Sequence, residues 1–165
     1  MSELARVDTA ALDQVGGAPQ TSVLYVIFKV GEAEYALAAD SIFQMESFSG
    51  ATAVPGAPSF VIGIVHVRGR IVPLVDLRIR FGLLPGPPVL ENRIVVGLCH
   101  ERLVGLLVDS GREVLKISPA QFQPPPRILD DQAGGFIKAV AQIGTRVIML
   151  VDFAKVIGEE HLDGI

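Results

Sequence analysis

The sequence predicts a mainly β protein assembled from hairpins. Three observations lead to this class: the apolar segments are short and rich in β-branched residues, turn signals separate them, and only two short stretches have a helical pattern. A chain of 165 residues corresponds to about one domain and can bury a sizeable core. Repeated hairpins at close spacing favour small barrels over a sheet of alternating strands and helices.

The first hairpin is predicted around a glycine turn. The apolar run VLYVIFKV at 23–30 is followed by Gly31 and then by YALAA at 35–39. Glycine provides the backbone freedom that a tight turn often requires, so these two runs are expected to pair.

The segment that follows has two interpretations. Asp40 or Ser41 could cap a helix whose apolar side chains are Ile42, Met45 and Phe48. Alternatively, residues 42–48 could form a further strand, and the pattern of this short run leaves both possibilities open.

The second hairpin carries a dense set of charges. SFVIGIVHV at 59–67 and RIVPLVDL at 70–77 are apolar strands joined at Arg68 and Gly69, where glycine can take a positive φ. Pro73 lacks an N–H group, and it therefore predicts an edge strand or a bulge at this position.

Two further hairpins and two helical fragments complete the pattern. The strands are RIVVGLC at 93–99 with LVGLLVDS at 103–110, and FIKAVAQIG at 136–144 with TRVIMLVDF at 145–153. The helical fragments are DLRIRFG at 76–82 and DFAKVIGEE at 152–160. The prolines of residues 82–91 suit an extended connector, which is expected to separate two hairpin-rich halves.

One domain is expected over residues 22–160. Residues 1–21 lack sustained periodicity and are expected to be a flexible tail, and residues 161–165 form a short C-terminal tail. The N-terminus carries acids where a signal peptide would be basic, and no apolar region follows, so a cytoplasmic protein is expected.

Composition argues against two classes of partner. The 14 Lys and Arg residues are outnumbered by 18 Asp and Glu residues, and the net charge of −4 disfavours nucleic acid. The mean hydropathy of +0.47 is high, yet no apolar run approaches the roughly 18 residues of a membrane span, so direct membrane insertion is not expected.

The sequence offers little support for metal, cofactor or enzyme chemistry. Cys99, His100 and Glu101 are adjacent, and neighbouring strand residues point to opposite faces, so they would not share one ion. His66 and His161 are isolated, and Cys99 is expected to be a buried thiol. Neither a nucleophile elbow nor a glycine-rich phosphate loop is present, so a protein without catalytic activity or cofactors is predicted.

Three carboxylates follow apolar strands in the repeated pattern LVD. Asp76, Asp109 and Asp152 could converge in one cluster, or they could be strand-end and helix-cap residues. The second interpretation is favoured because two of them precede the helical fragments.

The remaining signal is a binding surface. His66, Arg68 and Arg70 would share one face if strand geometry persisted, with Val65, Val67 and Ile71 toward the core, although the turn at Gly69 must break that register. Arg68 would then stand at a hairpin tip, either as a solvated turn residue or as a docking residue.

The run GIVHVRGRIVPLVDLRIRFG at 63–82, followed by RIVVGLCHERLVGLLVDS at 93–110, resembles the CheW-like family of bacterial chemotaxis coupling proteins. Its hallmark is an apolar strand, then Arg-Gly, then an Ile/Val-Pro-Ile/Val-Asp-Leu-Arg segment. The similarity extends from about Val23 to the run VIMLVDFAKVI at 147–157, so only the tails are left out.

The resemblance implies two interlocked SH3-like β-barrels with a hydrophobic groove between them and a few short helices. It also implies a non-catalytic adaptor that links the cytoplasmic tips of methyl-accepting chemoreceptors to the regulatory domain of a CheA-type histidine kinase. Such an adaptor would be cytoplasmic and associated with receptor arrays.

The family pattern also suggests residue roles. Arg68 matches the turn arginine and is the first candidate for contact with the receptor, while Gly63 lies where close backbone approach is expected. Ile42, Met45 and Val65 are candidates for lining the groove, although each could equally belong to the buried core.

The Asp-Leu-Arg element is expected to be architectural. Asp76 and Arg78 lie beyond the strand end, where an ion pair or a helix cap is favoured. Gly69 and Pro73 belong to the same motif and are expected to shape the hairpin.

Two positions depart from the family pattern. Gln44 stands where a glutamate is usual, and a neutral amide would hold Arg68 less firmly than a carboxylate. Ala139 stands where glycine is common, which matters only if the backbone has a positive φ.

Two alternatives to ordinary coupling follow. One is a specialised paralogue in another chemosensory pathway, such as surface motility or pilus control, with an altered or missing kinase or receptor contact. The other is a ligand-binding domain, which would need a pocket with convergent polar groups that the sequence alone does not show.

Overall fold

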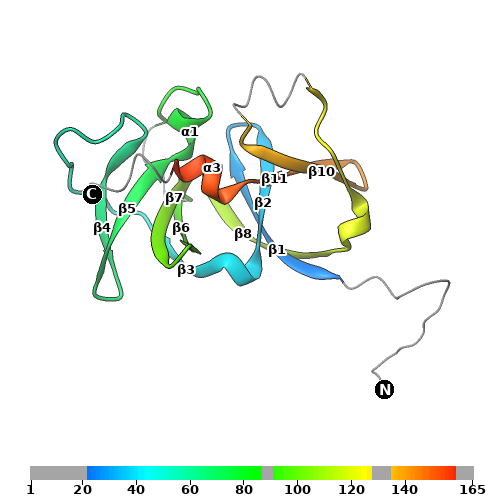
Figure 1. Ribbon diagram of the computed structural model, residues 1–165, viewed down its shortest axis with the longest axis horizontal. Coiled ribbons are helices and arrows are strands. Elements are labelled where there is room, and N and C mark those ends of the chain that lie inside the picture. The colour runs from blue at the N-terminus through cyan, green and yellow to red at the C-terminus, as the bar shows by residue number, and fades with distance from the viewer. Residues whose placement is uncertain (1–21, 87–90, 128–134, 159–165) are drawn as a thin grey trace, which may run out of the picture.

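The computed structural model describes residues 22–86, 91–127 and 135–158. Their strands form two sheets that lie side by side (Figure 1). The first sheet has six strands in the order β8-β1-β2-β11-β10-β9. These are β1 (Val23–Val30), β2 (Ala33–Ala38), β8 (Ser110–Ile117), β9 (Phe122–Gln123), β10 (Ile137–Ile143) and β11 (Arg146–Val151).

The second sheet has five strands in the order β3-β6-β7-β5-β4. These are β3 (Ile42–Ser47), β4 (Val61–Val67), β5 (Arg70–Asp76), β6 (Arg93–Cys99) and β7 (Arg102–Val108). The described helices are η2 (Ala39–Ser41), α1 (Leu77–Arg80), η3 (Pro119–Gln121) and α3 (Phe153–Ile157). The mainly β class is therefore confirmed, and the expected helical fragments are present as α1 and α3.

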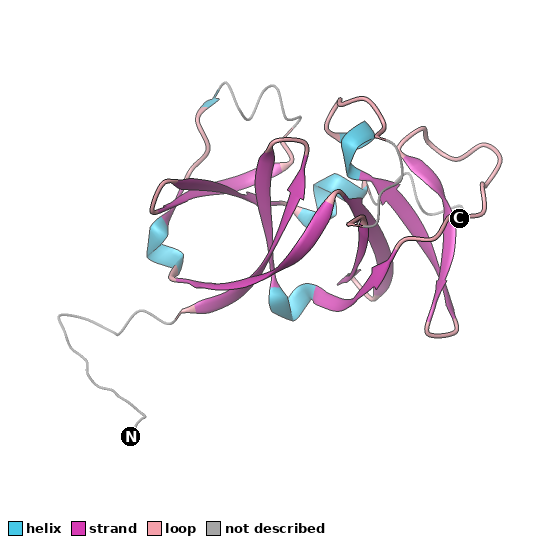
Figure 2. Cartoon of the chain, turned by 180° about the vertical axis from the view of Figure 1, so that it is seen from behind, coloured by secondary structure: helices cyan, strands magenta, loops and turns pink. Residues whose placement is uncertain are grey.

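The chain passes from the first sheet to the second and back again. It forms β1 and β2 in the first sheet, β3 to β7 in the second, and β8 to β11 in the first (Figures 1 and 2). The expectation of two halves flanking residues 82–91 is therefore wrong, because that connector lies between β5 and β6 of one sheet. The chain changes sheet between β2 and β3 and again between β7 and β8, and not at the proline-rich loop.

All four predicted hairpins are present, and two of them use consecutive residues with positive φ. Arg68 and Gly69 have φ values of 50° and 78°, while His100 and Glu101 have values of 50° and 69°. This pair of left-handed residues is typical of type I′ turns, whose twist matches that of the strands. Gly31 forms the first turn with φ 63°.

Both sheets have edge strands that are consecutive along the chain. In the first sheet, residues 118–121 alone join edge strand β8 to edge strand β9, so the sheet must curl to bring its edges together. In the second sheet, the longer segment 48–60 joins β3 to β4.

An ion-pair network also spans the curled first sheet. Arg146 on β11 donates to Glu34 on β2 at 3.0 and 2.7 Å and to Glu113 on β8 at 3.2 and 2.7 Å. β2 pairs directly with β11, but β1 and β2 lie between β8 and β11 in the sheet order, so the bonds to Glu113 connect strands that are not neighbours.

Three clusters of apolar side chains form the core. The largest lies between the sheets and draws Phe28 and Leu37 from the first sheet and Val95 and Leu106 from the second. The other two clusters belong to one sheet each, around Ile148 in the first and around residues such as Leu74 in the second. Helix α3 packs into the shared core and helps to hold the sheets together.

The segment after the first hairpin forms a strand, so the helix interpretation of residues 42–48 is wrong. A short 3-10 turn at Ala39–Ser41 comes first, and its N-cap residue Ala38 makes no side-chain cap hydrogen bond. β3 then pairs with β6 from Ile42 to Ser47. The pairing with β6 stabilises the strand over the helix, and the local sequence pattern does not reveal this long-range partner.

Pro73 lies in an inner strand, so the expectation of an edge strand is wrong. β5 has β4 on one side and β7 on the other, but its pairing with β7 begins only at Leu74. Pro73 lies opposite Ile64, whose own N–H and C=O groups bond to Thr52 on the far side of β4. The missing N–H of Pro73 therefore points away from β4, toward a position that β7 does not yet pair. The bulge lies opposite in β4, between Val61 and Gly63.

Candidate functional site

The β4–β5 hairpin presents Arg68 to solvent. Arg68 and Gly69 form its turn, and the flanking His66 and Arg70 are also exposed. Val65 and Val67 are buried, as strand alternation predicts. The hairpin is therefore a rigid support with an arginine at its tip.

Several strand ends meet around this turn. β4 ends where β5 begins, β6 ends where β7 begins, β3 begins opposite the end of β6, and β5 runs parallel to β7. These strand ends and the turns at 68–69 and 100–101 form one end of the second sheet, which we call the tip end.

Large apolar side chains are exposed at the tip end. Phe43, Ile71 and Leu98 are 46%, 62% and 51% exposed, and they come from β3, β5 and β6. Sequence reasoning missed all three, since each lies in an apolar run that suggests burial. The expectation that Ile71 turns toward the core is therefore wrong. The combination of arginine with exposed aromatic and aliphatic groups is typical of protein interfaces.

A cation–π contact connects the hairpin to β3. The guanidinium carbon of Arg70 lies 6.0 Å from the centroid of the Phe43 ring. The β3 register shifts between Ile42 and Gln44, and this bulge allows Phe43 to be exposed.

Gln44 points inward and has an unsatisfied amide. Its Oε1 atom is buried without a hydrogen-bond partner, and no hydrogen bond joins Gln44 to Arg68 among the described residues. A buried unpaired amide oxygen costs about 1–3 kcal/mol. Gln44 and Arg68 therefore make no hydrogen bond to one another in the described structure.

The other groove candidates are more enclosed. Ile42 and Met45 are partly buried and pack against the shared core, and Val65 is buried in the core of the second sheet. Only Ile42 lies at the tip end; Gly63 and Val65 lie further along β4.

Gly63 is a point of close backbone approach, as the sequence predicted. A Cβ atom there would lie 2.7 Å from the carbonyl carbon of Thr52. The approach arises because Thr52 pairs with Ile64 through two backbone hydrogen bonds of 2.8 and 2.9 Å.

The Asp-Leu-Arg element stabilises the fold. The expected helix cap and the expected ion pair are both present, but Arg78 forms its ion pair with Asp109 and not with Asp76. Asp76 caps α1 by accepting from the backbone N–H of Arg78 at 2.9 Å. The Arg78 guanidinium pairs instead with Asp109, through two bonds of 2.8 Å. Asp109 also accepts from the N–H of Gly31 at 2.8 Å, so this centre ties the second sheet to the first hairpin.

Burial raises the pKa of Asp76, and the nearby charge of Asp109 contributes to the increase. Asp152 caps α3 by accepting from the N–H of Lys155 at 3.3 Å. The three LVD carboxylates thus have separate structural roles, which confirms the favoured interpretation. Cys99 is buried as expected.

Within the described ranges, no group of three His, Cys, Asp or Glu side chains could hold a metal ion. His161 and both predicted tails lie outside the described residues. None of the helices in the described ranges has the length and hydropathy of a membrane span.

Comparison with known proteins identifies relatives along most of the chain. Residues 24–161 match the family model described as the CheW-like domain. A chemotaxis protein CheW of Rhizobium meliloti (strain 1021) is 33% identical over 136 residues, covering 82% of this chain and 88% of the relative. A chemotaxis protein CheW of Klebsiella aerogenes is 29% identical over 163 residues, covering 98% of this chain and 94% of the relative.

A solved structure shows the same fold. The crystal structure of the scaffolding protein TtCheW from Thermoanaerobacter tengcongensis superposes with a TM-score of 0.74 at 26% identity. The match covers 80% of this chain and 90% of that chain.

Two packed β sheets with an exposed end of arginine and apolar side chains define a protein-interaction domain. The family match over residues 24–161 then specifies the kind of domain: the chain belongs to the CheW-like family. It is an adaptor of chemotaxis signalling, and both relatives are named as chemotaxis proteins.

Proposed function

We propose that this chain couples methyl-accepting chemoreceptors to the regulatory domain of a CheA-type histidine kinase, without catalytic activity or cofactors of its own. The observation that carries the proposal is the tip end, where exposed Arg68 and Arg70 stand beside Phe43, Ile71 and Leu98. Aromatic and arginine side chains commonly dominate interface energies. The proposed location is the cytoplasm, in association with receptor arrays.

The proposed architecture is two interlocked SH3-like barrels with a hydrophobic groove between them. The short link at residues 118–121 and the bonds of Arg146 to Glu113 on the non-neighbouring strand β8 support curling of the first sheet toward a barrel. The return of the chain from the second sheet to the first supports interlocking.

Coupling would depend on how the receptor and the kinase are arranged around the adaptor. A helical receptor tip would contact Arg68 and the groove candidates, while strands of the adaptor pack against the kinase regulatory domain. A receptor state that binds one arrangement of this assembly more tightly would shift the kinase toward it. The Arg78–Asp109 centre would keep the two sheets from moving independently.

The direct test is calorimetric titration with the CheW-like regulatory domain of the kinase from the same organism. We expect saturable one-to-one binding with a Kd in the micromolar range, because arrays gain strength from many simultaneous contacts. Absence of binding to every such kinase domain of that organism would contradict the kinase contact.

The receptor contact is tested by Arg68→Glu. Receptor coupling should weaken while the melting temperature stays nearly unchanged, since an exposed turn residue has little packing to lose. Arg127→Glu is the matched control, because Arg127 is also exposed but follows β9 in the first sheet. A decrease in melting temperature beyond roughly 5 °C would indicate a structural role for Arg68.

A specialised paralogue is the second candidate, and the unsatisfied amide of Gln44 favours it. Gln44→Glu should increase the hold on Arg68 and change kinase control in a reconstituted array. Unchanged kinase output would mean that Gln44 does not tune coupling. Ala139 gives no support to this alternative, since the non-glycine residues with positive φ in the described ranges are Arg68, His100 and Glu101.

A further inference from the structure

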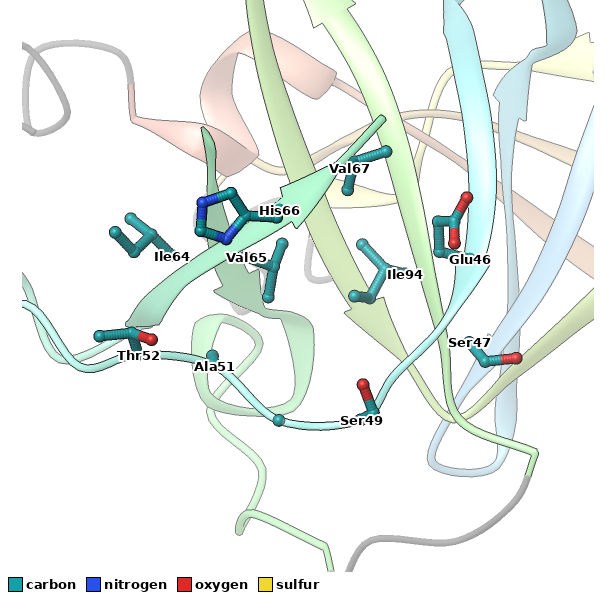
Figure 3. A pocket seen from close by; sticks show the side chains of 11 residues that line it. Glu46, Ser47, Ser49, Ala51, Thr52, Ile64, Val65, His66, Val67 and Ile94 are labelled. Carbon is teal, nitrogen blue, oxygen red and sulfur yellow. The ribbon is translucent and has the colours of Figure 1, made fainter. Parts of the chain in front are cut away.

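A cavity of about 480 Å³ opens between the two edge strands of the second sheet (Figure 3). A smaller part of its lining is apolar, formed by the edges of the largely buried side chains Val65 and Val67 of β4 and Ile94 of β6. Polar side chains come from the end of β3, the following loop and β4. They are Glu46, Ser47, Ser49, Thr52 and His66.

Glu46 differs from the other partly shielded carboxylates of the described chain. Each of those has a partner: Glu34 and Glu113 bind Arg146, Asp109 binds Arg78, and Asp76 and Asp152 cap helices. No ion pair or hydrogen bond joins the Glu46 carboxylate to another residue in the described ranges. A partly buried charge is normally paired, so Glu46 is poised for a cation from outside.

We propose that this cavity binds the side chain of a lysine or arginine presented by an extended segment of a partner protein. Such a side chain combines an apolar stem with a cationic head. The stem would lie against Val65, Val67 and Ile94, and the head would reach Glu46 and the hydroxyl groups of the rim.

The charge and polarity of the cavity favour a cationic side chain over other kinds of ligand. An anion would be repelled by Glu46, and a purely apolar group would shield the carboxylate from water without replacing its hydration. A cation on a hydrocarbon stem satisfies both parts of the lining.

The strand edges favour a peptide over a free amine. β3 and β4 are the edge strands of the sheet, and a backbone pair already forms on the outer edge of β4 between Thr52 and Ile64. Edge strands offer backbone donors and acceptors to an extended segment. The occupant would therefore gain backbone hydrogen bonds beside the cavity as well as the ion pair within it.

The site runs along β4 and adjoins the tip end at His66 and Val67, and its occupation requires neither receptor nor kinase. The test uses the full chain labelled with ¹⁵N and titrated with N-acetyl-lysine N-methylamide. We expect saturable amide shifts centred on Glu46, Thr52 and His66. N-acetyl-norleucine N-methylamide, which has the stem without the charge, should bind about fivefold more weakly.

Two variants test the residues. Glu46→Gln should weaken binding of the lysine probe about fivefold, whereas Glu32→Gln, which removes an exposed acid from the β1–β2 turn, should leave it unchanged. Ser49→Lys supplies a competing ammonium group within the chain and should also weaken binding. Retention of the wild-type amide spectrum verifies that each variant is folded.

Equal binding of the lysine and norleucine probes, or an unchanged affinity in both Glu46→Gln and Ser49→Lys, would overturn the proposal. Butylammonium distinguishes the source of the cation. If it binds as tightly as the blocked lysine, the cavity recognises a free amine and the proposed peptide occupant is wrong.

Discussion

The two sheets of this protein connect their edge strands in different ways. In the six-stranded sheet, residues 118–121 join the edge strands directly, and Arg146 on β11 also bonds to Glu113 on edge strand β8. In the five-stranded sheet, the longer segment 48–60 joins the edges, and a backbone pair at Thr52 and Ile64 spans part of the distance.

The two sheets also differ in whether their carboxylates have ion-pair partners. Glu34 and Glu113 of the first sheet are paired with Arg146, whereas Glu46 remains unpaired among the described residues beside a cavity in the second sheet. The acids of the first sheet are therefore satisfied by an internal cation, and Glu46 remains available to an external group. The same kind of curled sheet can provide a rigid unit or a binding cavity, depending on the length and partners of one connection.

The largest expected effect comes from disturbing the backbone pair between Thr52 and Ile64 beside the cavity in the second sheet. Gly63→Ala would place a methyl group against the Thr52 carbonyl, and the segment 51–52 would have to move. We expect a loss of about 3 kcal/mol in the free energy of unfolding, measured by urea denaturation. Gly69→Ala is a useful comparison, because that glycine also has a positive φ but open space around it. Equal losses in both variants would mean that backbone conformation, and not the approach of Thr52, restricts position 63.

The next effect concerns the ion-pair network of the first sheet. Arg146→Met should leave Glu34 and Glu113 without their shared cation and destabilise the fold by about 2 kcal/mol. The corresponding decrease in melting temperature is about 4–8 °C for a chain of this size. The triple variant with Glu34→Gln and Glu113→Gln should recover part of the loss, and no recovery would show that repulsion between the carboxylates is unimportant.

Acid should weaken the first sheet through the same network. The hydrogen bonds of Arg146 lower the pKa of Glu34 below its ordinary value of 4.5. A lowered pKa in the folded state stabilises the protein above the unfolded pKa, and this contribution disappears as the pH falls through the folded value. The unfolding free energy should therefore decrease less steeply below about pH 4.5 in Arg146→Met than in the wild type.

The pKa of Asp76 is shifted in the opposite direction to that of Glu34, so Asp76 provides a control for the acid measurement. Burial raises its pKa, so its protonation on acidification favours the folded state. Urea denaturation at several pH values, repeated in Asp76→Asn, separates this contribution from that of Glu34. An identical acid slope in the wild type and Arg146→Met would contradict the assignment to Arg146.

The smallest effect is expected at the open cavity. Glu46→Gln should change the free energy of unfolding by less than about 0.5 kcal/mol, because no internal partner among the described residues is lost. Thermal denaturation of Glu46→Gln and Arg146→Met under the same conditions compares the stability lost in each sheet. A loss above about 1 kcal/mol would show that Glu46 contributes to the fold itself.

Local chemistry explains which features the sequence could predict. The turns at Gly31 and Arg68-Gly69, the cap by Asp76 and the burial of Val65 each depend on a few neighbouring residues. Strand alternation and turn propensity act at this range, so the hairpins and the exposed turn arginine are visible without coordinates.

The candidate surface was only partly predictable. Arg68 was found from its motif, but Phe43, Ile71 and Leu98 lie in runs whose composition suggests burial. Their exposure depends on a bulge in β3 and on which strand ends meet, and both follow from long-range pairing.

By itself, the sequence determined the mainly β class, the four hairpins, the helix caps and the turn that presents Arg68. The tertiary structure alone decided how the chain divides between the sheets, that Arg78 pairs with Asp109, and that Glu46 stands unpaired beside a cavity. The physical reason is range: turns and caps are stabilised by neighbouring residues, whereas edges, ion-pair partners and cavities arise where distant segments meet.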